Sequence, residues 1–244
     1  MKVINVEQRS EEWLEARQSV ITGTRVKEIA PPSRKVKTGS QTMGFWKLVA
    51  EYVSYGVLDE SPMERGTQLE NENAEIAVQK LGLKNPLYDC GMWVSDDGKI
   101  GYSPDASEDS DHPTWAIECK SLSTAEHLFL ICGDKFAKGE MPDIMEPLFP
   151  ERPEAYRGIS SVAEEHRNQV QQAFVVNPDL KVLYYCLYDP RVVIDEYKHH
   201  IIEVRREDMM EEIQKQSEMV YQQAELARGV AMLIAAKQLA EESE

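Results

Sequence analysis

Apolar residues recur at two different spacings along the chain. In the first third they return every three or four positions, which is typical of amphipathic helices. This pattern predicts helices at residues 10–17, 22–29, 43–55 and 62–80. After residue 80 the pattern changes to short apolar runs bounded by turn-forming residues, as in β-strands.

The strand-like runs fall in two groups with a helical stretch between them. We predict strands at residues 87–94, 99–103, 115–120, 181–188 and 196–204, with a turn at 95–98. Ser123 and Glu126 have capping-box spacing and predict the start of a helix that ends near residue 131. Residues 133–160 contain four prolines and suggest a long irregular loop. Further helices are expected at 162–175 and from residue 206 onward.

Helices followed by short strands with interspersed helices favour a sheet with helices on its faces. The predicted fold class is therefore α/β, with a mixed central β-sheet flanked by helices and a long C-terminal helix. We expect a single domain over residues 1–244. Its parts are a basic helical segment at 1–60, a core at 61–205 and the C-terminal helix at 206–244.

Charge is distributed unevenly along the 244 residues. The net charge is −16, which by itself argues against a nucleic-acid partner. Residues 1–47, however, carry nine basic and five acidic side chains, so this segment is at +4 and the rest at −20. A basic segment on an acidic body can hold phosphate locally. An ordinary solvated basic surface is the alternative.

Several classes of protein are disfavoured by composition. Hydrophobic residues make up 42% and charged residues 29%, as in soluble globular proteins. No apolar run approaches the roughly 20 residues of a membrane span, and no secretion signal is visible, so we expect a cytoplasmic protein. The four cysteines follow no CxxC spacing, which favours reduced, buried thiols over a metal cluster.

Candidate chemistry is concentrated in residues 102–120. Asp105 is expected at the end of one strand, and Glu118 and Lys120 are two positions apart on another, so they point to the same face. Adjacent strands lie about 4.8 Å apart, so Asp105 and Glu118 could share a magnesium ion with the Cys119 backbone carbonyl. Lys120 could orient the attacking water or stabilise charge on a phosphate. Surface ion pairs are the ordinary alternative for such a short pattern.

Further candidates lie on the predicted helices. Glu70 precedes the strands and could reach the waters of a metal, although a mid-helix glutamate is usually solvated. Gln169 belongs to a Q-x-Q segment that could equally be a polar helix face. Arg17 and Thr24 flank a predicted helix start, where a guanidinium, hydroxyls and free N–H groups could bind an anion. A helix with its cap is the simpler interpretation.

Six short motifs occur in one order along the chain. They are the Trp13–Arg17–Thr24 opening, R-G-x-x-x-E ending at Glu70, S-P-D ending at Asp105, E-x-K ending at Lys120, Q-x-Q starting at Gln169 and Y-D-P-R ending at Arg191. This ordered set resembles the phage lambda exonuclease family, the YqaJ-like viral recombinases of the PD-(D/E)XK nuclease superfamily. The resemblance covers residues 6 to 218 approximately.

The resemblance implies a restriction-endonuclease-like core and a 5′→3′ exonuclease that degrades one strand of double-stranded DNA. It also implies dependence on Mg²⁺, with Mn²⁺ as a substitute. A ring-shaped homotrimer and transfer of the exposed 3′ strand to a single-strand annealing protein are further implications. The family pattern does not extend to residues 133–160, where the loop of this chain is long.

The resemblance also assigns roles to individual residues. Asp105 and Glu118 correspond to metal ligands, Lys120 to the catalytic lysine and Glu70 to a second-shell or second-metal acid. Gln169 corresponds to an active-site glutamine. Residues facing the 5′-phosphate correspond to Arg17 and Thr24, with Ser103 as a further candidate.

Two other functions are compatible with the sequence. One is an endonuclease or a Cas4-like nuclease of the same superfamily, although Cas4-like proteins carry a cysteine cluster that the dispersed cysteines here do not form. The other is a catalytically silent DNA-end-binding or scaffold protein. The presence of both acids and the lysine disfavours this second alternative.

Overall fold

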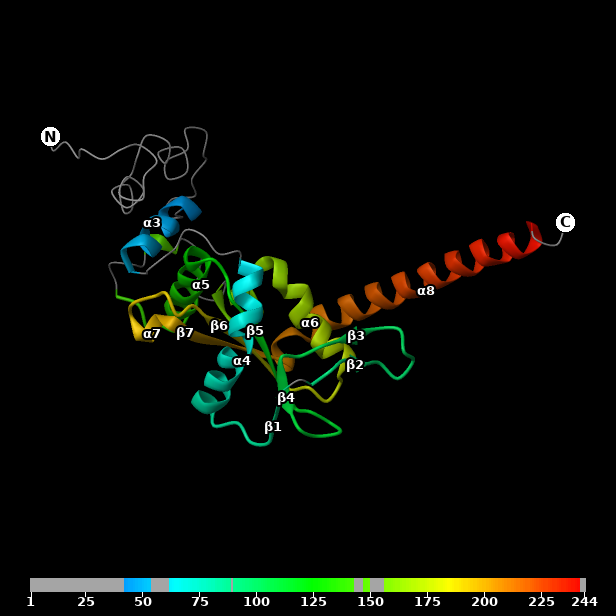
Figure 1. Cartoon of the computed structure of the whole chain (residues 1–244), viewed down its shortest axis with the longest axis horizontal. Coiled ribbons are helices and arrows are strands. Elements are labelled where there is room, and N and C mark those ends of the chain that lie inside the picture. Colours follow the sequence, from blue (N-terminus) through cyan, green and yellow to red (C-terminus); the bar gives the residue numbers. More distant parts are fainter. Residues whose placement is uncertain (1–41, 54–61, 89, 143–146, 150–155, 242–244) are drawn as a thin grey trace. The chain divides into compact units, whose positions relative to one another are not determined.

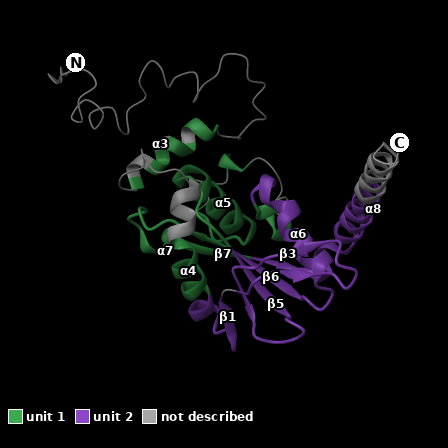
Figure 2. Cartoon of the chain, turned by 45° about the vertical axis from the view of Figure 1, so that its right-hand side comes forward, with its two compact units in different colours: residues 1–77, 119–162, 186–202 green, residues 78–118, 163–185, 203–244 purple. Residues whose placement is uncertain are grey.

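The structure is a computed structural model that describes residues 42–53, 62–88, 90–142, 147–149 and 156–241 (Figure 1). The helices predicted at 10–17 and 22–29 lie outside these residues. The chain divides into two compact units (Figure 2). Unit 1 comprises Met1–Ala77, Cys119–Val162 and Cys186–Ile202, and unit 2 comprises Val78–Glu118, Ala163–Tyr185 and Glu203–Glu244.

Five strands form the main sheet in the order β1-β4-β5-β6-β7. Their bounds are β1 Pro86–Tyr88, β4 Ala106–Glu108, β5 Trp115–Lys120, β6 Val182–Tyr188 and β7 His199–Arg205. Strands β1, β4 and β5 pair antiparallel. The Lys181 N–H donates to the Thr114 carbonyl, so β5 and β6 start side by side and run parallel. The sheet is therefore mixed, as predicted.

A separate hairpin joins β2 (Trp93–Val94) to β3 (Gly101–Tyr102), which pair antiparallel. The strand predicted at residues 87–94 is wrong as a single element, because β1 ends at Tyr88 and β2 starts at Trp93. Gly91 adopts a φ of 64°, which interrupts an extended backbone. The turn predicted at residues 95–98 is confirmed by the hydrogen bond from Gly98 N–H to the Ser95 carbonyl.

The main helices are α3 (Met43–Val53), α4 (Pro62–Leu81), α5 (Thr124–Ala137), α6 (Arg167–Val176) and α8 (Met210–Glu241). Shorter elements are α7 (Asp195–Lys198) and the 3₁₀ turns η3 (Gly158–Ser161), η4 (Glu164–His166) and η5 (Arg206–Met209). Among the described residues, no helix is long and apolar enough to cross a membrane.

Local sequence explains where two of these helices begin and end. Pro62 occupies the first position of α4, where its missing N–H costs nothing. Gly82 follows the helix with φ 62°, and Leu83 N–H donates back to the Val78 carbonyl, which completes a glycine C-cap. The predicted capping box of α5 is confirmed, because the Ser123 and Glu126 side chains cap each other's backbone N–H groups.

Other predicted boundaries need correction. Helix α5 continues to Ala137 instead of ending near residue 131, because its later residues pack into the core of unit 1. Residues 195–198 form the short helix α7, so the strand predicted at 196–204 starts only at His199. The helix predicted at 162–175 starts at Arg167, after two 3₁₀ turns.

The core of unit 1 forms between α3 and α5. Its buried members are Trp46, Ala50, Ala125, Leu128, Cys132, Phe149 and Val192. The Y-D-P-R turn belongs to this unit. Asp189 is fully buried and accepts two hydrogen bonds from the Arg191 guanidinium and one from the Thr124 hydroxyl, at the start of α5.

Unit 2 is held together by α6, α8 and one arginine. Arg206 donates hydrogen bonds of 2.7 Å to the backbone carbonyls of Phe174, Asn177 and Leu180. These carbonyls lie at the end of α6 and before β6, so one guanidinium satisfies groups that the helix leaves unpaired. Gln216 of α8 also donates to the Asn168 carbonyl of α6.

Candidate active site

Glu118 is the only acidic residue of β5 and is almost completely buried, with 1% of its surface exposed. Its two carboxylate oxygens accept hydrogen bonds from different elements. The Tyr102 hydroxyl of β3 donates to Oε2, and the Gln169 amide of α6 donates to Oε1 over 2.6 Å. A buried carboxylate requires such donors or a cation, because burial removes its hydration. Two elements of unit 2 therefore converge on this one side chain.

Asp105 is joined to the same strand through its backbone. Its N–H donates to the Ile117 carbonyl over 3.1 Å, while Ile117 is also the register partner of Ala106. Asp105 thus contacts β5 at the same residue that Ala106, the first residue of β4, pairs with. Asp105 is partly exposed and lies beside the residue that precedes Glu118.

Strand β4 follows Asp105 directly and pairs with β5, and the sequence did not predict this strand. Residues 107–113 (SEDSDHP) suggest a polar connection between two strands, yet Ala106 and Ser107 are buried. The Glu108 carboxylate accepts hydrogen bonds from the backbone and hydroxyl of Thr114 and thereby closes the loop between β4 and β5. Because the polar residues in and after this strand form the turn, the strand cannot be recognised from hydropathy.

The other predicted ligands and catalytic groups have different settings. Cys119 and Lys120 are the last two residues of β5, where Cys119 is buried and Lys120 is partly exposed. Both are assigned to unit 1. Glu70 is an exposed residue of α4 in unit 1. Ser103 is exposed between β3 and Asp105. The structure thus brings together Glu118, Gln169 and the backbone of Asp105.

Two candidate phosphate-binding residues, Arg17 and Thr24, lie outside the described residues. Tyr102 was not among the predicted site residues. Tyr102 stands three positions before Asp105, and its hydroxyl reaches Glu118 across 16 positions of sequence. A tyrosine at the end of a short strand gives no sign of its hydrogen-bond partner.

The donor set favours a hard cation over zinc or iron. Among the described residues, no group of three or more His, Cys, Asp and Glu side chains is placed to hold a metal ion. Mg²⁺ has different requirements, because it keeps several waters and is bound through one or two carboxylates. Asp105 and Glu118 are both carboxylates, the type of ligand that Mg²⁺ prefers.

The cysteines do not form a cluster. All four are described as free thiols, three of them buried. Burial raises the pKa of Cys132 to about 12, so this thiol is protonated at neutral pH. Metal binding requires the thiolate. The prediction that the thiols are mostly buried is confirmed.

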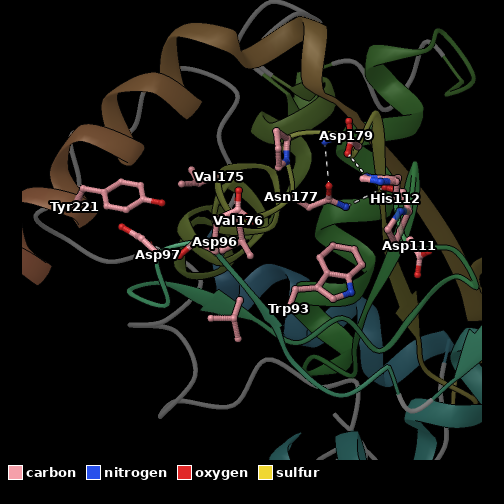
Figure 3. A pocket seen from close by; sticks show the side chains of 14 residues that line it. Trp93, Asp96, Asp97, Asp111, His112, Val175, Val176, Asn177, Asp179 and Tyr221 are labelled. Carbon is pink, nitrogen blue, oxygen red and sulfur yellow. Dashed lines mark hydrogen bonds and ion pairs between the residues drawn. The ribbon is translucent and has the colours of Figure 1, made fainter.

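A separate hollow of about 560 Å³ lies in unit 2 among the β2–β3 hairpin, the end of α6 and α8 (Figure 3). Its acidic lining residues are Asp96, Asp97, Asp111 and Asp179. The described lining has no lysine or arginine, and its His112 is hydrogen-bonded to Asp179. Such a lining repels phosphate, so the hollow does not serve as a 5′-phosphate pocket.

The chain matches no protein-family model and no curated protein. It is similar to two solved structures of one protein. The alkaline exonuclease LHK-Exo from Laribacter hongkongensis is 20% identical, with a TM-score of 0.46, over 93% of this chain and 99% of that one. LHK-Exo in complex with dAMP is 19% identical over the same shares of the two chains, with a TM-score of 0.47. The chain is therefore similar to a solved alkaline exonuclease over nearly its whole length.

Proposed function

We propose that this chain is a magnesium-dependent deoxyribonuclease that digests one strand of double-stranded DNA from its 5′ end. The observation that carries the proposal is the buried Glu118 carboxylate, which accepts hydrogen bonds from Tyr102 and Gln169 beside the Asp105 backbone. Lys120 follows two positions later on β5. The order of motifs that resembles the phage lambda exonuclease family supplies the choice of reaction.

Asp105, Glu118 and the Cys119 carbonyl would hold Mg²⁺, and Mn²⁺ would substitute for it. When bound, such an ion lowers the pKa of its water and offsets charge on the phosphate. Lys120 would orient the attacking water and stabilise the developing charge with its ammonium group. Gln169 would hold Glu118 in place, and Glu70 would act as a second-shell or second-metal acid.

The substrate end and the assembly are part of the same proposal. Arg17, Thr24 and Ser103 would face the 5′-phosphate, and the basic N-terminal segment would attract the DNA backbone. A homotrimeric ring would keep the enzyme on its substrate between steps, and an annealing protein would receive the 3′ strand. Light scattering at micromolar concentration tests the trimer, and a monomeric mass contradicts it.

The nuclease itself is tested with three DNA substrates of one sequence: linear, nicked circular and covalently closed circular. We expect Mg²⁺-dependent loss of the linear DNA, no cleavage of the closed circle, and faster release of a 5′ label than of a 3′ label. Cleavage of the closed circle would establish the endonuclease alternative. End binding without cleavage in Mg²⁺ or Mn²⁺ would establish the silent end-binding alternative.

A further inference from the structure

Tyr102 occupies a rigid position in the β2–β3 hairpin. Its register partner is Trp93, and the two ring centroids are 5.9 Å apart. The preceding residue is Gly101, where an added Cβ would lie 3.1 Å from the Trp93 carbonyl oxygen. The hairpin backbones therefore approach closely, and the Tyr102 ring is buried with 6% of its surface exposed. This packing fixes the place from which the hydroxyl donates.

The Tyr102 hydroxyl and the Gln169 amide hold opposite oxygens of Glu118. The last torsion of a glutamate side chain is broad and roughly twofold, so an unheld carboxylate turns freely. A donor on each oxygen restricts this rotation. Each carboxylate oxygen has two lone pairs, so an oxygen that accepts a hydrogen bond can also bind a cation.

We infer that Tyr102 is a positioning residue that presents the Glu118 carboxylate to a divalent cation in one orientation. This inference rests on the proposed function and extends it to a residue whose role could not be predicted from the sequence. Hydrogen bonds to metal-binding carboxylates commonly change metal affinity by about 10- to 100-fold when removed. Tyr102 acts through Glu118, so its loss should weaken cation binding more than it slows the loaded enzyme.

Tyr102→Phe tests the inference, because it removes one oxygen and keeps the ring packed on Trp93. The matched control is Tyr188→Phe in unit 1, which also removes a phenol that donates to a carboxylate, that of Glu72. Mn²⁺ binding to the full-length protein without DNA is followed by electron paramagnetic resonance of free Mn²⁺. We expect about tenfold weaker binding in Tyr102→Phe and wild-type binding in Tyr188→Phe.

Cleavage gives a second measurement. In Tyr102→Phe the Mg²⁺ concentration for half-maximal cleavage should rise about tenfold, and excess Mg²⁺ should restore the rate. A general structural defect would not respond to Mg²⁺. Wild-type Mn²⁺ affinity in a folded Tyr102→Phe protein would overturn the inference while leaving the nuclease proposal intact. A wild-type protein that neither binds Mn²⁺ nor cleaves DNA would overturn both.

Circular dichroism establishes whether Tyr102→Phe folds. If it does not, Gln169→Met removes the other donor at an exposed position of α6. Because the two donors restrict the same carboxylate, this variant should also bind Mn²⁺ about tenfold more weakly. Unchanged Mn²⁺ affinity in Gln169→Met would show that orientation of Glu118 by hydrogen bonds does not control cation binding, and would overturn the inference.

Discussion

A buried histidine in unit 1 makes stability depend on pH in a defined window. His127 of α5 is fully buried, and its Nε2 lies 2.7 Å from the Tyr197 carbonyl oxygen. The carbonyl can only accept, so Nε2 carries the hydrogen. Its Nδ1 has no hydrogen-bond partner among the described residues. Burial lowers the pKa of His127 from 6.5 to about 4, because a charged imidazolium would lose its hydration.

The sign and size of the effect follow from this pKa. At pH values between 6.5 and about 4, the unfolded chain carries a proton on His127 and the folded chain does not. The contribution of His127 to the free energy of unfolding is therefore fully present above pH 6.5 and is lost as the pH falls toward 4. At 1.36 kcal/mol per pKa unit the loss amounts to about 3 kcal/mol. Asp134 and Asp189, whose pKa values lie below 3.8 because of His200 and Arg191 respectively, contribute only at lower pH.

His127→Gln keeps an amide donor for the Tyr197 carbonyl and cannot titrate. Urea unfolding of wild type and variant should be compared between about pH 7 and about pH 4.5. We expect the advantage of wild type over the variant to shrink by about 2–3 kcal/mol across this range. His112→Gln, which replaces an exposed histidine, should follow the wild-type curve. Parallel curves for wild type and His127→Gln would refute the reasoning.

Four further predictions concern the site and unit 2. Glu118→Gln should reduce the rate of DNA cleavage by about a hundredfold or more. Glu203→Gln, at an exposed position of β7, is the control and should leave the rate unchanged. Gel assays of linear DNA measure both rates. Ca²⁺ should support DNA binding with little cleavage, because its looser coordination activates water less well, and equal rates in Ca²⁺ and Mg²⁺ would count against the site. Arg206→Ala should lower the free energy of unfolding by about 2–4 kcal/mol, because three backbone carbonyls lose a charged donor. Replacing the exposed Arg205 with alanine is the control and should change this free energy by less than about 1 kcal/mol. Urea titrations measure both. Arg17→Ala should narrow the rate gap between 5′-phosphoryl and 5′-hydroxyl DNA by about ten- to a hundredfold, and an unchanged ratio would place the phosphate pocket elsewhere.

Sequence alone predicted the elements whose signals are local. Strand β5 was predicted with its observed bounds, because its apolar run is bounded by polar residues and turns. The start of α5 was predicted from the capping box, and α4 from a proline start and helical periodicity. These signals depend on residues that are close together in sequence, so they can be recognised without knowledge of the fold.

Elements that depend on distant partners could not be predicted in the same way. Strand β4 is three residues long and is defined by its pairing with β1 and β5, not by its own composition. The last turns of α5 persist because Cys132 and neighbouring residues pack into the unit 1 core. Residues 196–198 were predicted as the start of a strand but belong to the short helix α7 before β7.

The candidate site shows the same division. The E-x-K spacing identified Glu118 as a candidate, because residues two positions apart on a strand point to the same face of the sheet. Its hydrogen-bond partners lie 16 and 51 positions away in sequence, so the convergence of Tyr102 and Gln169 appears only in the folded chain. Gln169 was a candidate that could equally be part of a polar helix face, and its hydrogen bond to Glu118 is visible only in the fold.

The Y-D-P-R turn shows that a segment of this chain can match a family motif and still have a structural role. The Y-D-P-R turn counted toward the resemblance, yet Asp189 and Arg191 form a buried ion pair that anchors the Thr124 end of α5. Its contribution is to the stability of unit 1, since breaking a buried pair leaves an uncompensated charge. Glu118 is also buried, but its hydrogen bonds come from the Tyr102 hydroxyl of β3 and the Gln169 amide of α6. This convergence of two elements on one buried carboxylate next to the Asp105 backbone, and not the motif count, supports the proposed function.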